Sequence, residues 1–91
     1  MGVRWTTSAN RDLVRLHEFL QAVDAGAAAQ AVRVVLGGVR RIARHPRIGR
    51  RLPQFEPREV RRVIAGDYEI RYEVRKADLV VLRVWHVHED R

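Results

Sequence analysis

The side chains that could do chemistry gather towards the end of the chain. His86 and His88 are two residues apart on a predicted strand, so their side chains point to the same side of it. Arg71 lies on the strand before it. Two imidazoles can serve as general acid and base, and a guanidinium can stabilise charge that develops on a phosphate. His86, His88 and Arg71 are therefore the candidate catalytic residues if the protein cleaves RNA, a reaction that requires all three to meet around one phosphate.

Two histidines separated by one residue can also chelate a metal ion. Spacing fixes no third ligand, however, and the sequence has no cysteine, which excludes thiolate-based zinc sites, thiol nucleophiles and disulfides. A solvated strand end or a contact with a partner protein explains the pair more simply. We expect no metal site and no cofactor.

Arginine dominates the charge of the chain. There are 18 Lys and Arg residues against 11 Asp and Glu, a formal charge of +7, and Lys76 is the one lysine among them. Nine arginines fall between positions 40 and 62, where the only acids are Glu56 and Glu59. A basic segment of this kind suits a polyanionic partner, either a nucleic acid or an acidic protein, and a solvated loop is the plain alternative.

Aromatic residues are sparse in this basic segment. Phe55 is the only one between positions 40 and 62, so the segment offers no platform on which single-stranded bases could stack. This favours a groove that receives an acidic, partly disordered protein segment. The candidate binding residues are Arg40, Arg44, Arg47, Arg50, Arg51, Arg61 and Arg62.

The composition is that of one small folded domain spanning residues 1–91. The chain is 46% hydrophobic and 32% charged, which argues against disorder. Its longest apolar run has four residues, Leu79 to Leu82, far too short to cross a membrane, and no apolar signal segment follows Met1. We expect a cytoplasmic protein that makes no contact with membranes.

Two helices are predicted from apolar residues that repeat at spacings of four and three. The first runs over residues 8–23 and the second over residues 25–44. Asp12 falls in the first turn of the first helix, where the helix dipole favours a negative charge, and Asp24 can cap the second helix. The two apolar stripes are Ala9, Leu13, Leu16, Leu20 and Val23, thickened by Phe19, and then Ala28, Val32, Val35, Val39 and Ile42.

Glycines and prolines interrupt these patterns at two places. Gly37 and Gly38 lie inside the second helix, where close packing against a neighbouring element is favoured over a hinge. Residues 45–57 hold all three prolines of the chain and are predicted to form a loop that apolar side chains pin to the core. These side chains are Ile48, Leu52 and Phe55.

Three strands are predicted over residues 59–65, 68–75 and 79–88, after a short edge strand at residues 3–5. The middle strand alternates between an apolar face and a polar one, as in a half-buried antiparallel sheet. The fold class is therefore α+β, of order β-αα-βββ, with the helical hairpin packed on one face of a mostly antiparallel sheet. Tyr68, Ile70, Tyr72 and Val74 should lie beneath Leu13, Leu16, Leu20, Val32, Val35 and Val39, with Glu69, Arg71, Glu73 and Arg75 facing away.

Six segments, in this order and spacing, resemble the RelE/ParE superfamily of bacterial toxins. They are Trp5-Thr6 with Ala9 and Asp12-Leu13, the alanine-rich second helix, His45 to Arg50, Arg58 to Arg61, Tyr68 to Val74, and Val81 to His86. The resemblance covers essentially the whole chain. It implies a RelE/ParE-like fold and a type II toxin that is bound and silenced by an antitoxin with an acidic C-terminal segment, in a hetero-oligomeric complex.

The superfamily has two branches with different targets. RelE-like toxins cut mRNA in the ribosomal A site, whereas ParE-like toxins inhibit DNA gyrase and have no nuclease activity of their own. The long alanine-rich hairpin, the phrase from His45 to Arg50 and the chain end resemble the ParE branch. Glu69 stands where RelE-like toxins commonly carry an arginine, and a carboxylate there would repel phosphate. His88 also stands where family members often have an arginine.

The resemblance therefore implies a toxin that blocks growth by inhibiting DNA gyrase. Trp85, His86, His88 and Arg91 are its candidate target-binding residues. One alternative is a RelE-like, ribosome-dependent mRNA endonuclease that uses the catalytic candidates above, with the ribosome and mRNA as partners. Another is a family member that retains antitoxin binding but is no longer toxic.

Overall fold

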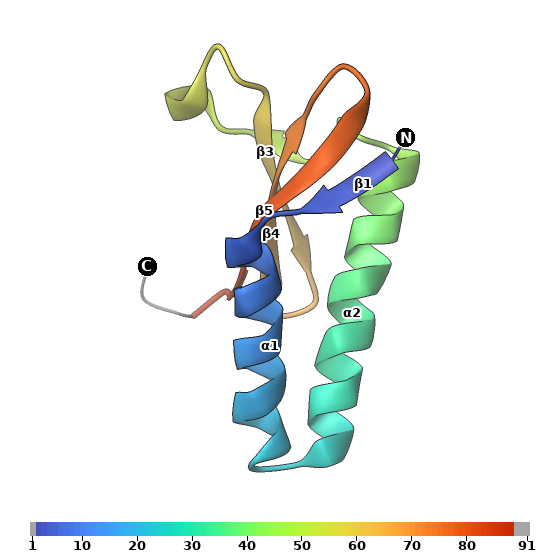
Figure 1. Cartoon of the computed structure of the whole chain (residues 1–91), viewed down its shortest axis with the longest axis vertical. Helices are drawn as coiled ribbons and strands as arrows, with labels where there is room; N and C mark the ends of the chain where they lie inside the picture. The colour runs from blue at the N-terminus through green and yellow to red at the C-terminus, as the bar shows by residue number, and fades with distance from the viewer. Residues whose placement is uncertain (1, 89–91) are drawn as a thin grey trace.

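A computed structural model describes residues 2–88 of the chain (Figure 1). Its elements are β1 (Gly2–Trp5), α1 (Thr7–Gln21), α2 (Ala25–Arg44), β2 (Arg50–Arg51), the 3-10 turn η1 (Pro53–Phe55), β3 (Val60–Ala65), β4 (Tyr68–Val74) and β5 (Asp78–His86). The strands form one sheet of order β1-β5-β4-β3-β2, with both helices packed on the same face. β1 pairs with β5 in parallel, and the other neighbours pair antiparallel. The predicted α+β fold is confirmed, with β2 as an additional short edge strand.

Side-chain caps set the N-termini of the helical hairpin. Thr6 Oγ1 accepts a hydrogen bond from Ala9 N at 3.0 Å, and α1 begins one residue before its predicted start and ends two residues before its predicted end. Asp24 Oδ1 accepts hydrogen bonds from the N–H groups of Gly26 and Ala27, and α2 has the predicted bounds. Within residues 2–88, neither helix is long and apolar enough to cross a bilayer.

Helix α2 approaches the sheet closely through a small residue. A Cβ atom on Gly38 would lie 2.8 Å from Ala65 Cβ and from Ile70 Cδ1, so the close packing expected of this glycine is confirmed. Val32 is half-buried and does not belong to the core cluster, and Phe19 is 70% exposed, so placing both in the core was wrong. The buried helix residues that cover the sheet are Ala9, Leu16, Ala31, Val35, Val39 and Ile42, joined by the partly buried Leu13, Leu20 and Val34.

Strand β4 has the predicted register. Its residues in the core under the helices are Tyr68, Ile70, Tyr72 and Val74. Its other face is not solvated as predicted, because Glu69 is only 1% exposed and Glu73 is also buried. Arginine side chains and the ring of Phe55 lie over this face of the sheet. The sheet therefore has two covered faces, one apolar and one charged.

The segment over residues 45–57 is more ordered than the predicted loop, since it contains β2 and η1. Tyr72 pins its start to the sheet: the hydroxyl donates to Pro46 O at 2.7 Å and accepts from Gly49 N at 3.0 Å. A Cβ atom on Gly49 would lie 2.6 Å from this hydroxyl, so the glycine is needed for the contact. Leu52 is buried and Phe55 half-buried as predicted, whereas Ile48 is exposed, so naming it as an anchor was wrong.

A bulge in β5 decides which side chains reach each face. Arg71 of β4 pairs with Arg83 and Tyr72 with Val81, so Leu82 is the extra residue. Asp12 of α1 bridges the bulge: its carboxylate accepts from Arg83 Nε at 2.8 Å and from Val84 N at 2.9 Å. Asp12 is buried and is the sixth residue of α1, beyond its first turn, so the expectation that it serves the helix dipole there was wrong.

Candidate functional site

The charged face of the sheet carries a stack of rings and guanidinium groups. The guanidinium carbon of Arg71 lies 4.7 Å from the centroid of the Trp85 ring and 5.3 Å from that of Phe55. The guanidinium of Arg83 lies 4.9 Å from the Trp85 ring. Trp85 is only 7% exposed. Cation–π contacts of this kind fix the orientation of the arginines and cover the aromatic faces.

Glu69 lies at the floor of this face between two arginines. Arg62 Nη1 is 3.3 Å from Glu69 Oε1, and Arg71 Nη2 is 3.8 Å from Glu69 Oε2. The carboxylate of Glu69 was expected to repel phosphate. In the structure its single negative charge is matched by two positive ones, so the local charge of the three side chains is positive. The expected repulsion is therefore offset.

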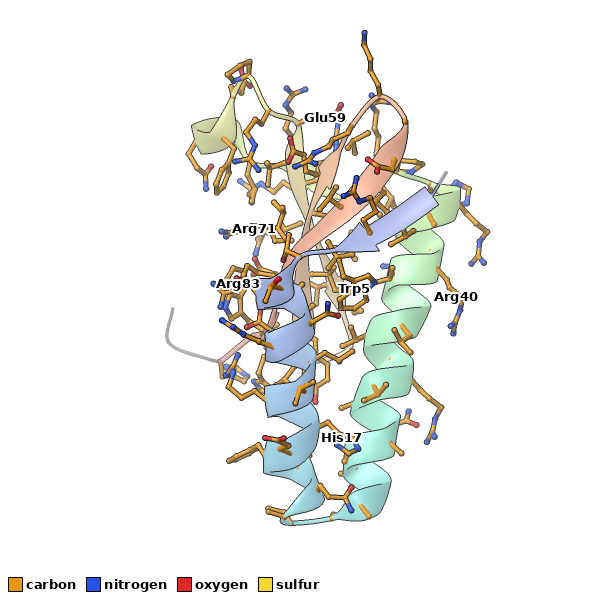
Figure 2. The ribbon with its side chains drawn as sticks, viewed as in Figure 1. Trp5, His17, Arg40, Glu59, Arg71 and Arg83 are labelled. Carbon is orange, nitrogen blue, oxygen red and sulfur yellow. The ribbon has the colours of Figure 1, made fainter. Side chains whose placement is uncertain are left out.

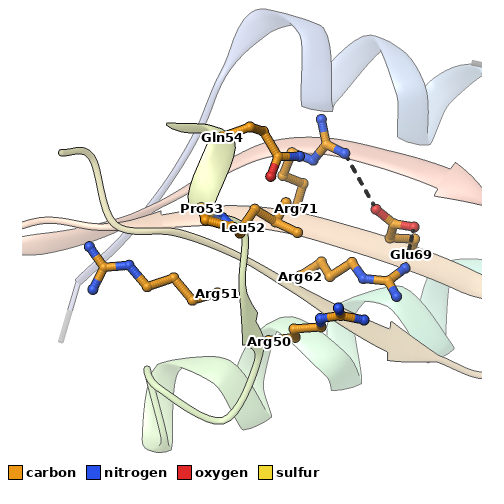
Figure 3. Close-up of a pocket in the computed structure, with 8 residues that line it drawn as sticks. All are labelled: Arg50, Arg51, Leu52, Pro53, Gln54, Arg62, Glu69 and Arg71. Atoms are coloured by element: carbon orange, nitrogen blue, oxygen red, sulfur yellow. Dashed lines mark hydrogen bonds and ion pairs between the residues drawn. The ribbon is translucent and has the colours of Figure 1, made fainter. Parts of the chain in front are cut away.

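A shallow pocket of about 410 Å³ opens above Glu69 (Figure 3). Four of its lining residues are arginines and one is a glutamate, a surplus of three positive charges. The segment that contains β2 and η1 forms one wall, and β3 and β4 supply the floor. The lining residues are Arg50, Arg51, Leu52, Pro53, Gln54, Arg62, Glu69 and Arg71.

The two histidines lie on the other side of the sheet. His86 pairs in register with Tyr68, whose ring faces the helices, and the two rings meet edge-on with centroids 5.5 Å apart. The rings of His86 and His88 are 5.4 Å apart, and His86 Nδ1 accepts from His88 N at 3.2 Å. They border a second pocket of about 700 Å³, lined by Arg15, Leu16, Phe19, Leu20, Ala27, Asp67, Tyr68, His86 and His88.

The structure therefore does not bring the catalytic candidates together. Residues that pair directly across antiparallel strands share a face of the sheet. Arg71 shares one face with Arg83, and His86 shares the opposite face with Tyr68. Among residues 2–88, no three His, Cys, Asp or Glu side chains are close enough to hold a metal ion.

The seven candidate arginines fall into three sets. Arg47 and Arg61 both bind the carboxylate of Glu59 at 2.9 Å, and the hydrogen bond from Arg47 lowers the pKa of Glu59, against the effect of burial. Arg50, Arg51 and Arg62 line the charged pocket. Arg40 and Arg44 are exposed on α2 and make no ion pair within residues 2–88, and Figure 2 shows Arg40 pointing away from the helix hairpin into solvent. The predicted single groove is thus divided.

Comparison with known proteins identifies the family of the chain. The family model of the ParE toxin of type II toxin–antitoxin systems, parDE, matches residues 3–91. The chain belongs to the ParE toxin family. A comparison with curated protein sequences found no match. A chain of the chromosomal ParDE system from P. aeruginosa is similar in fold, with a TM-score of 0.78 at 20% sequence identity over 94% of this chain and 95% of that one.

Family membership makes this protein the toxin component of a type II toxin–antitoxin module, whose partner is an antitoxin. The predicted resemblance, and its ParE side, are confirmed. The target-binding candidates of the ParE-family toxin are spread over two faces: Trp85 is covered by Arg71 and Arg83, whereas His86 and His88 border the pocket beside α1. Arg91 lies outside the described residues.

Two contributors to the charged face were missed from the sequence. Phe55 and Arg83 hold Arg71 and Trp85 in place, yet each was read only as a loop anchor or as part of a family phrase. Alternation along the last strand was an available signal, since it puts Arg83 and Trp85 on one face. The bulge at Leu82 determines that this face is the one that carries Arg71, and alternation within the strand does not reveal the bulge.

Proposed function

We propose that this ParE-family toxin arrests growth by binding DNA gyrase, with no proton transfer of its own. The observation that carries the proposal is the separation of Arg71 from His86 and His88 by the thickness of the sheet. RNA cleavage needs an acid, a base and a charge stabiliser within a few ångströms of one phosphate. Inhibition by binding needs only a contact surface.

The proposed gyrase contact is the chain end, over residues 85–91. In its described part, His86 and His88 border a pocket whose wall includes Phe19, which is largely exposed. An exposed aromatic side chain beside a concave apolar surface is typical of a protein contact. Trp85 lies on the charged face and contributes through the guanidinium groups of Arg71 and Arg83, which it orients. We place this interaction in the cytoplasm.

We further propose that the antitoxin neutralises the toxin through an acidic C-terminal segment, in a hetero-oligomeric complex. Two of the exposed arginines of α2, Arg40 and Arg44, and Arg50 of β2 have no ion pair within the described part of the chain. They can therefore accept acidic partners without breaking existing contacts. Arg47 and Arg61 are already held by Glu59 and should contribute less.

The test combines the purified toxin with gyrase and with ribosomes. We expect the parent to inhibit DNA supercoiling by gyrase and to raise a DNA-damage response on induction in cells. The double variant His86→Ala/His88→Ala, checked for folding by circular dichroism, should keep gyrase inhibition within about tenfold, because alanine at most interface positions costs little. Ribosome-dependent mRNA cuts by the parent, lost by about 10²–10⁴-fold in the folded double variant, would overturn the proposal.

One observation on the charged face of the sheet favours the alternative of mRNA cleavage. The pocket above Glu69 carries a surplus of positive charge that could hold a phosphate. Among the described residues that line it there is no histidine, and its one carboxylate, Glu69, is engaged with Arg62. Gyrase inhibition is therefore the better supported function.

A further inference from the structure

The charged pocket over β3 and β4 is built more rigidly than a surface cluster of arginines. The guanidinium of Arg71 is held against the rings of Phe55 and Trp85. The buried carboxylate of Glu69 holds Arg62 at 3.3 Å and lies 3.8 Å from Arg71 (Figure 3). The guanidinium groups of Arg62 and Arg71 are thereby fixed side by side before any partner binds. A ligand that meets them loses little additional side-chain entropy.

The pocket also has more positive charge than its own residues neutralise. Arg51 lies 3.8 Å from Glu56 and is partly matched. Among the other lining residues, three arginines (Arg50, Arg62 and Arg71) face the single carboxylate of Glu69, so the lining itself has two more positive than negative charges. Arg50 makes no ion pair or side-chain hydrogen bond with any of residues 2–88, and it is exposed. A concave surface of this charge attracts an anion.

The walls of the pocket indicate which kind of anion it can bind. Leu52 and Pro53 provide an apolar side, against which the methylene groups of a glutamate or aspartate side chain can pack. The planar guanidinium fork matches a carboxylate in a bidentate manner. An acidic side chain therefore fits both the wall and the floor of the pocket.

A nucleic acid fits this pocket less well. The aromatic rings beside it, Phe55 and Trp85, are covered by guanidinium groups, so bases have no free ring on which to stack. Binding through phosphates alone needs cations spaced along a path. None of the exposed arginines of α2 lines the pocket, so they add no phosphate contact within it.

We infer that this pocket is the receptor for one acidic side chain of the antitoxin, with Arg50 closing on the carboxylate and Glu69 acting as a positioning residue for Arg62 and Arg71. The inference rests on the proposed neutralisation by an acidic antitoxin segment, and it deepens that proposal by assigning one anchor point. It also gives the buried Glu69 a role, since without it the two guanidinium groups would repel each other.

The first experiment measures binding of the antitoxin encoded beside the toxin gene to the full-length toxin by isothermal titration calorimetry. Arg50→Gln should weaken binding by about tenfold or more, the value of one lost charge-assisted hydrogen bond. Arg33→Gln is the matched control: Arg33 is exposed on α2, loses the same charge, and bonds only to Gln30 in the described residues. It should change the affinity by less than about twofold.

The second experiment locates the acidic side chain by double-mutant cycles. Each Asp or Glu of the antitoxin segment is changed to its amide and tested against the parent toxin and Arg50→Gln. One acid should lose most of its effect in the Arg50→Gln background, since its partner is already gone. If Arg50→Gln binds like the control, or if every cycle is additive, the pocket is not the receptor.

The outcomes separate this inference from the proposed function. Failure of the antitoxin to bind the parent toxin at all would overturn the proposed neutralisation. Normal binding that ignores Arg50 would overturn only the pocket. Weaker binding of a mixed-sequence single-stranded oligonucleotide by Arg50→Gln, with unchanged antitoxin binding, would assign the pocket to nucleic acid instead and would also overturn the inference.

Discussion

The two faces of the sheet are stabilised by different physical means. On the helix-covered face, Ile70, Tyr72 and Val84 are fully buried among apolar side chains. On the charged face, Glu69 and Glu73 are also buried, but each carboxylate is held by arginines whose outer ends reach water. The first face therefore sets the stability of the fold, while the second presents oriented charge to solvent.

The interactions on the two faces also differ in strength and in their dependence on salt. Apolar burial contributes about 25 cal/mol per Å² and depends little on salt. Ion pairs with half-exposed arginines contribute about 0–1 kcal/mol each and weaken as salt is added. The hydrogen bond from Arg58 lowers the pKa of Glu73 against the effect of burial, so this carboxylate stays ionised at neutral pH.

The largest expected effect comes from truncating the apolar face. Ile70→Ala should lower the free energy of unfolding by about 2–4 kcal/mol, because it leaves a cavity under α2. Ile64 is a matched control on the neighbouring strand: it pairs with Glu69 on the charged face and is 47% exposed. Ile64→Ala should cost less than about 1 kcal/mol. Urea unfolding followed by circular dichroism measures both, and equal losses would contradict the division between the faces.

The next effect concerns Asp12, the polar group that ties α1 to the bulge in β5. Burial raises the pKa of Asp12, but hydrogen bonds from Arg83 and Val84 N, with the charge of Arg83, outweigh it and hold the pKa below its usual value. Asp12→Asn keeps the size but loses the charge. It should cost about 1.5–3 kcal/mol at pH 7.

The pH dependence of this loss has a definite sign. A lowered folded-state pKa contributes stability above the unfolded value of about 3.9, and this stability is lost as pH falls through the folded value. The difference between parent and Asp12→Asn should therefore be constant from pH 7 to about 5 and shrink below about 4. Glu59 and Glu73 titrate in both proteins and cancel in the difference. A gap that persists unchanged at pH 3 would show that Asp12 acts through shape and not through charge.

The fold was largely predictable because its signals are local and periodic. The four-three spacing gave both helices, Asp24 gave the start of α2, and the alternation from Tyr68 to Val74 gave the register of β4. Close packing at Gly38 was also predictable, because a glycine inside a helix needs a reason. Each of these inferences depends on residues that are neighbours along the chain.

The site was less predictable because its contacts are distant in sequence. Asp12 meets Arg83 and Val84 from 71 and 72 residues away, and no local pattern distinguishes that role from a favourable charge in a first helical turn. Strand β2 has only two residues, Arg50–Arg51, too few to show alternation. The bulge at Leu82 then moved the histidines and Arg71 to opposite faces, which no spacing within a single strand can reveal.

The smallest predicted effect concerns an ion pair on the charged face of the sheet. Arg75 is 48% exposed and lies 3.1 Å from Glu73, which keeps a second partner in Arg58 at 2.8 Å. Arg75→Gln should therefore change the free energy of unfolding by less than about 1 kcal/mol in low salt. The difference should vanish in 1 M NaCl, where the screening length is about 3 Å. A loss above about 2 kcal/mol that survives 1 M NaCl would mean that the ion pairs are as structural as the apolar core, and the charged face could no longer be regarded as a surface kept for partners.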